Sequence, residues 1–116
     1  MVSMPEGYDV DLLGISATDP GTGVVWTLEG STQVNANLVR FDAGGGVAEH
    51  VNEEVDVLFV GVAGSGSVRV EGEEHALSAG RLVFAPRGAR RSTGTSSDGF
   101  AYLTIHRRRG PLRIGA

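Results

Sequence analysis

Residues 44–95 read GGGVAEHVNEEVDVLFVGVAGSGSVRVEGEEHALSAGRLVFAPRGARRSTGT, and this stretch holds most of the pattern that predicts the fold. Three apolar runs within it, at 55–62, 67–71 and 81–86, are rich in Val, Leu and Phe and have the lengths of strands. Glycines separate the runs, and glycine supplies the positive φ angles that tight turns need. The stretch therefore predicts short strands joined by tight turns.

The same pattern continues on both sides of this stretch. Further apolar runs lie at 24–29, 36–41 and 100–106. Val68 and Val70 alternate with polar neighbours, which is the period of a half-buried strand, and Glu71-Gly72 then indicates a hairpin turn. No segment shows ten or more residues of helical periodicity. Many short strands at regular spacing predict an all-β sandwich or barrel.

Length and composition limit the classes of protein that the chain can represent. A chain of 116 residues suits one domain, which we divide into an N-terminal arm at 1–22, a barrel at 23–107 and a C-terminal tail at 108–116. The absence of cysteine excludes disulfides, thiolate zinc sites and cysteine nucleophiles. A net charge of −4 argues against a nucleic-acid partner, although seven of the ten arginines fall between 87 and 113. With neither a signal-peptide pattern nor an apolar span, we expect a cytoplasmic protein without a membrane partner.

Two groups of residues within 44–95 keep a distinctive spacing. The first reads Gly44, five residues, His50, Val51, Asn52, three residues, Asp56, and then Gly64. The second reads Gly80, five residues, Pro86, Arg87, Gly88, two residues, Arg91, three residues, Thr95. With their glycines, proline and hairpin spacer, these groups resemble the two conserved motifs of the cupin superfamily. The resemblance implies a small antiparallel double-stranded β-barrel of the jelly-roll type.

The resemblance also implies where a metal would be bound in a typical cupin. The family's ligands are two His and a Glu from the first motif and one His from the second, and here those positions hold His50, Asn52, Asp56 and Arg91. Residues 50, 52 and 56 would share one side of an extended strand, and the barrel would bring residue 91 near them. Only His50 keeps the family's residue type, so the resemblance supplies the positions but not the chemistry.

Arg91 decides how we interpret these changes. A guanidinium has no lone pair for a metal, and a unit charge ~4 Å from a divalent ion costs roughly 8 kcal/mol at an effective dielectric of about 20. We therefore expect no resident metal, and expect His50, Asn52, Asp56 and Arg91 to bind a small polar or anionic molecule in the barrel mouth. An ion pair between Asp56 and Arg91 that only satisfies a buried charge is an open alternative.

The last apolar run adds two candidates. Tyr102, Thr104 and His106 share one face of this strand, so Tyr102 and His106 are candidate wall residues of the ligand site. If that face points inward, His50, Asp56 and His106 form a set suited to Fe, Mn, Zn or Ni. The alternative function is then a metal-dependent cupin enzyme of the dioxygenase or isomerase type.

Two further questions stay open at this level. A purely structural or interaction module is a third hypothesis, and nothing in the sequence decides whether the chain catalyses a reaction. Val24, Val25 and Trp26 form an apolar edge near the N-terminal arm, and related barrels commonly pair through such strands. We therefore expect a homodimer, and we expect Trp26 and Phe59 to be core or interface residues.

Overall fold

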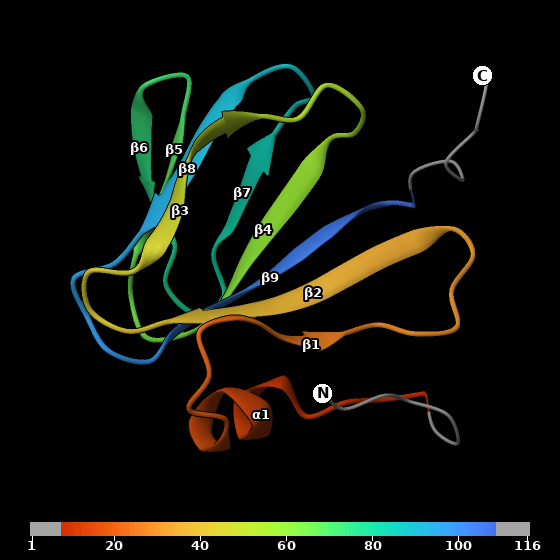
Figure 1. The fold of residues 1–116 in the computed structure, drawn as a ribbon, viewed down its shortest axis with the longest axis vertical. Coiled ribbons are helices and arrows are strands. Elements are labelled where there is room, and N and C mark those ends of the chain that lie inside the picture. Colours follow the sequence, from red (N-terminus) through yellow and green to blue (C-terminus); the bar gives the residue numbers. More distant parts are fainter. Residues whose placement is uncertain (1–7, 109–116) are drawn as a thin grey trace.

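The computed structural model describes residues 8–108, which contain one short helix and nine strands in two antiparallel sheets (Figure 1). The five-stranded sheet has the order β1-β2-β9-β4-β7, and the four-stranded sheet has the order β3-β8-β5-β6. The elements are α1 (Leu12–Thr18), β1 (Gly23–Thr27), β2 (Val34–Phe41), β3 (Gly46–Val51), β4 (Val57–Ala63), β5 (Ser67–Val70), β6 (Glu73–Ala76), β7 (Leu82–Ala85), β8 (Arg90–Gly94) and β9 (Phe100–Arg107). The expected all-β, antiparallel class is confirmed.

The six apolar runs correspond to β1, β2, β4, β5, β7 and β9. The runs do not cover β3, β6 and β8, in which no more than two apolar residues follow one another. These three strands belong to the four-stranded sheet. Strands without a longer apolar run give little signal to detect.

The hairpin between β5 and β6 has the turn that the sequence predicts. Val70 pairs with Glu73, so Glu71 and Gly72 form a two-residue loop. Both loop residues have positive φ, 50° at Glu71 and 80° at Gly72, as a type I′ turn requires. Glycine adopts a positive φ without steric cost, and Glu71 adopts one at the position directly before it.

The main core lies between the two sheets. It combines inward residues of β2, β4, β7 and β9 with Val68 of the opposing sheet, and Phe59 is one of its members. Tyr102 stands among three aromatic rings, with its centroid 5.2 Å from that of Phe100 and 5.8 Å from that of Phe59. Alternation along β9 sends Phe100 and Tyr102 into this core and Ala101 and Leu103 to the opposite face.

A second cluster occupies the outer face of the five-stranded sheet, and α1 covers it (Figure 1). Leu12 and Ile15, one turn apart on α1, pack there with Trp26 and Leu38. Asp11 caps the helix because its side chain accepts the N–H of Gly14 at 2.9 Å. The sequence had indicated no helix, since seven residues are too few for a periodicity criterion of ten or more. Of the expected arm and tail, residues 1–7 and 109–116 lie outside the described part.

The apolar edge expected at 24–26 is only partly exposed. Val25 and Trp26 are buried in the cluster beneath α1, so Trp26 is a core residue, whereas Val24 is 57% exposed on β1 at the edge of its sheet. Within the described residues, no helix has both the length and the apolar character needed to cross a membrane.

Candidate functional site

A cavity of about 190 Å³ opens between the two sheets, where β3 and β8 face β9 and β4. Such a volume slightly exceeds the ~150 Å³ that holds a benzene molecule. Its walls combine an apolar side with a polar side. The lining residues are Val39, Val47, His50, Asn52, Val57, Phe59, Arg91, Thr93, Tyr102, Thr104 and His106.

Arg91 is the charged group of this cavity. Position 91 on β8 lies directly opposite His50 of β3, so both side chains project from the same face of the sheet. The residue is only 2% exposed. Its Nε donates to the carbonyl of Ala89 at 2.8 Å, and one Nη donates to the carbonyl of Pro86 at 2.7 Å. The turn at 86–89, closed by the Ala89 N–H on the Pro86 carbonyl, supplies both acceptors.

These contacts hold the guanidinium in place without neutralising it. No ion pair joins Arg91 to a carboxylate anywhere in residues 8–108. Burial lowers the pKa of Arg91 below its usual value, and the negative charge of Asp56 offsets part of that shift. The cavity wall thus contains a buried cation whose partners are neutral carbonyls.

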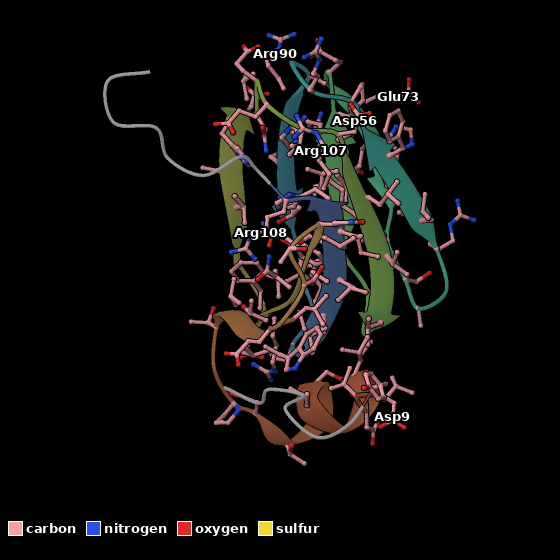
Figure 2. The ribbon with its side chains drawn as sticks, turned by 90° about the vertical axis from the view of Figure 1, so that its right-hand side faces the viewer. Asp9, Asp56, Glu73, Arg90, Arg107 and Arg108 are labelled. Carbon is pink, nitrogen blue, oxygen red and sulfur yellow. The ribbon has the colours of Figure 1, made fainter. Side chains whose placement is uncertain are left out.

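Asp56 does not lie in the cavity, which corrects the expectation that residues 50, 52 and 56 share one side of a strand. β3 ends at Val51, and Asp56 is the last residue of the loop that leads to β4. Its carboxylate is exposed and accepts the N–H of Arg87 at 2.8 Å. It borders a surface groove that also contains Arg107 and that shares His106 with the cavity, and Figure 2 shows the side chains of Asp56 and Arg107 in the same part of the molecule.

Asn52 forms the turn that directs the chain away from the side of the strand expected for residues 50, 52 and 56. Its Oδ1 accepts the N–H groups of Glu54 at 2.9 Å and Val55 at 3.2 Å, which makes an Asx turn directly after β3. Because Oδ1 is occupied by two donors, the amide orientation is defined and Nδ2 remains a donor. An Asn followed by two charged residues indicates a turn. The expectation that residues 50, 52 and 56 share one side of a strand did not take this turn into account.

Both histidines expected at the site do line the cavity. The Nδ1 of His50 lies 2.9 Å from the carbonyl oxygen of Ala48, and the Nδ1 of His106 lies 2.8 Å from that of Arg107. A carbonyl oxygen only accepts, so each Nδ1 carries the hydrogen and each neutral ring keeps a lone pair on Nε2. His106 sits on the inward face of β9 with Tyr102 and Thr104, while Leu103 and Ile105 pack on the outer side.

Tyr102 forms the floor of the cavity and is 1% exposed. Its hydroxyl lies 2.9 Å from that of Thr93, whose oxygen also accepts the N–H of Val47 at 3.1 Å. Burial raises the pKa of Tyr102 to about 12, and the hydrogen bond with Thr93 opposes part of that rise. Thr93 was not among the expected site residues, although its spacing of two from Arg91 on β8 places it on the same face.

Comparisons with known proteins agree with this architecture. The family model described as Cupin domain matches residues 37–105, more than half of the chain. The chain is a cupin. Its fold resembles KdgF from a Halomonas species, with 23% identity over 74% of this chain and 78% of that one, at a TM-score of 0.68.

Two other solved structures are also similar to this chain. TT1209 from Thermus thermophilus is 24% identical over 88% of this cupin and 98% of its own chain, with a TM-score of 0.68. The DMSP lyase DddQ from Ruegeria pomeroyi DSS-3 is 25% identical over 72% of this cupin but only 42% of its own chain, with a TM-score of 0.62. No curated protein sequence matches significantly.

The cavity residues of this cupin do not fit the family's usual metal centre. That centre uses imidazoles and a carboxylate, whereas the cavity contains two imidazoles, an amide and a guanidinium. Asp56 supplies no carboxylate there, and no cluster of three or more His, Asp or Glu side chains suited to a metal ion occurs between residues 8 and 108. Arg91 adds a positive charge to the wall of the cavity that a divalent cation would have to enter.

Proposed function

We propose that this cupin binds a small anionic molecule in the cavity between the sheets, without a metal centre, and that Arg91 holds the negative charge. One observation carries the proposal: Arg91, which is 2% exposed, lines the cavity, and among residues 8–108 its guanidinium bonds only backbone carbonyls. A buried charge that forms no ion pair is costly, and an anion in the cavity offsets that cost.

The number of hydrogen-bond donors on Arg91 also supports an anionic ligand. Arginine carries five N–H groups, and the carbonyls of Ala89 and Pro86 take two of them. The carbonyl contacts orient the planar group, so the remaining donors are preorganised for a carboxylate or phosphate. An ion pair with Asp56 would have satisfied Arg91 within the chain, but Asp56 instead accepts the backbone N–H of Arg87.

The two rival hypotheses have less support. A metal-dependent enzyme built on His50, Asp56 and His106 lacks its carboxylate in the cavity. A purely structural module does not account for an open cavity with a buried cation on its wall. The expected homodimer and cytoplasmic location stay predictions, with Val24 on the edge strand β1 as an exposed apolar residue for a second copy.

The test is to remove the charge of Arg91 and measure anion binding. Acetate, propionate, benzoate and phosphate are titrated into the protein, with propionamide as the neutral counterpart of propionate, by thermal shift and calorimetry. A charge-assisted hydrogen bond contributes about 1.5–3 kcal/mol, so Arg91→Met is expected to weaken acid binding by about tenfold or more. Arg91→Lys keeps the positive charge but lacks the planar guanidinium that can donate to both oxygens of a carboxylate, so it is expected to bind acids with intermediate affinity.

The neighbouring arginine supplies a matched control. Arg90 lies on the same strand but its side chain projects outward (Figure 2). There it pairs with Glu71 at 3.4 Å. Arg90→Gln is therefore expected to leave anion affinity unchanged. The proposal is refuted if Arg91→Met binds the acids as the wild type does. It is also refuted if propionamide binds as well as propionate, or if the wild type shows no saturable binding of any acid at millimolar concentration.

A further inference from the structure

Apart from the hydroxyls of Thr93, Tyr102 and Thr104, which can both donate and accept, the polar groups of the cavity form two sets with opposite hydrogen-bonding character. The donor set consists of the N–H groups that Arg91 has left and the Nδ2 of Asn52, whose Oδ1 is taken by two backbone N–H groups. A ligand group that contacts this set must accept hydrogen bonds, and a carboxylate does so with both oxygens.

The acceptor set consists of the two imidazoles. His50 comes from β3 and His106 from β9, and each directs its Nδ1–H to a backbone carbonyl. In the neutral form both rings therefore present an Nε2 that accepts. A ligand group that contacts this set must donate a hydrogen bond, and a carboxylate alone has no hydrogen to give.

The lining also has an apolar part, and the cavity volume limits the size of the ligand. Val39, Val57 and Phe59 contribute hydrocarbon surface to the lining. Since a ~150 Å³ cavity holds benzene, a cavity of about 190 Å³ suits a molecule of roughly six to ten non-hydrogen atoms. Inorganic phosphate would leave the apolar wall without contacts, and a sugar would exceed the size or lack the charge.

We infer that the ligand is a small hydroxycarboxylic acid. Its carboxylate binds Arg91 and Asn52, its hydroxyl donates to Nε2 of His50 or His106, and its short hydrocarbon portion packs on the apolar wall. The inference rests on the proposed anion site, to which it adds the hydroxyl and the role of the histidines. The two histidines then select among acids, while Arg91 selects acids over neutral molecules.

The experiment compares acids that differ only by a hydroxyl group. Lactate is paired with propionate, 3-hydroxybutyrate with butyrate, and salicylate with benzoate. Affinities are measured by calorimetry at about pH 8, where free imidazole is neutral. One hydrogen bond is expected to make the hydroxy acid of at least one pair about three- to tenfold tighter in the wild type.

The histidine variants test where that increment comes from. His50→Phe or His106→Phe is expected to abolish the increment while the parent acid keeps its affinity within about twofold. His75→Gln is the matched control, because His75 lies outside the cavity and pairs with Glu73 at 3.3 Å. Should a variant fail to fold, the ¹⁵N resonance of the imidazole Nε2 in the wild type is expected to shift with the hydroxy acid and not with its parent.

The outcomes separate this inference from the proposed function. If no acid binds the wild type, the anion site itself is refuted. If acids bind but no hydroxyl raises affinity, the anion site stands and the hydroxy-acid inference fails. The same conclusion follows if the increment persists in both histidine variants, or if neither imidazole resonance responds to the hydroxy acid.

Discussion

Raising the pH tests the environment of Tyr102, the floor of the ligand cavity. The chain has neither lysine nor cysteine and only two tyrosines, Tyr8 and Tyr102. In the Tyr8→Phe background, Tyr102 is therefore the sole group whose ionisation absorbs as tyrosinate. Burial raises the pKa of Tyr102 from 10.0 to about 12, so the tyrosinate signal is expected to appear near pH 12.

The same pKa shift predicts how stability depends on pH. The folded state keeps the Tyr102 proton to higher pH than the unfolded state, so this contribution to stability is complete below pH 10 and decreases as the pH rises toward 12. Each pH unit in that window costs about 1.4 kcal/mol, which gives a loss of roughly 1.4 kcal/mol at pH 11. Loss of the 2.9 Å hydrogen bond with Thr93 makes Tyr102→Phe less stable by about 1 kcal/mol at pH 8.

The two effects predict a reversal that urea unfolding can measure. Tyr8→Phe is expected to be more stable than Tyr8→Phe/Tyr102→Phe at pH 8, and the order is expected to invert near pH 11. Taking the difference between the two variants cancels the other titrating groups, including Arg91, because both variants contain them. A tyrosinate midpoint near pH 10, or a stability difference that does not change with pH, would show that the cavity floor is solvated and refute the reasoning.

Three further substitutions test the backbone and the cavity mouth. A Cβ at Gly61 would overlap the backbone carbonyl of Ser78, so Gly61→Ala is expected to cost at least about 2 kcal/mol of unfolding free energy, measured in urea. A Cβ at Gly94 meets nothing within 4 Å, so Gly94→Ala should change stability by no more than about 0.5 kcal/mol, and equal costs would contradict this account. Asn52→Asp keeps the acceptor that the Asx turn needs but replaces the Nδ2 donor by a negative oxygen. It is expected to leave stability within about 1 kcal/mol and to weaken benzoate binding by about tenfold in calorimetry, and unchanged binding would exclude Asn52 from the donor set.

Local patterns account for what the sequence predicted correctly about the fold. Alternation at Val68 and Val70, the Glu71-Gly72 turn and the two spaced motifs each depend on residues close together in the chain. Strand period and turn chemistry act over that same short range, so they are readable without coordinates. The family model over residues 37–105 confirms the resemblance that these motifs suggested.

The structure corrected an inference that continued a local sequence pattern beyond the strand to which it applies. The expectation that residues 50, 52 and 56 lie on one side of a strand assumed that the strand is continuous. The Asx turn of Asn52 interrupts the strand and leaves Asp56 outside the cavity. The helix α1 escaped notice because its seven residues are stabilised by packing on Trp26 and Leu38 rather than by a long periodic sequence.

The order of amino acids alone was enough to establish the strand pattern, the family resemblance and the presence of an arginine where a typical cupin has a histidine. The three-dimensional structure was needed to establish that Arg91 is buried on the wall of a cavity and that backbone carbonyls rather than Asp56 are its partners. It was also needed to find the carbonyl partners from which the hydrogen of His50 and of His106 is assigned to Nδ1. The difference arises because the burial of Arg91 and the lining of the cavity depend on atoms from distant segments, and because sequence spacing does not show which nearby carbonyl a side chain bonds. The strands β3 and β8 belong to one sheet and β4 and β9 to the other, so their side chains line one cavity only when the two sheets pack together.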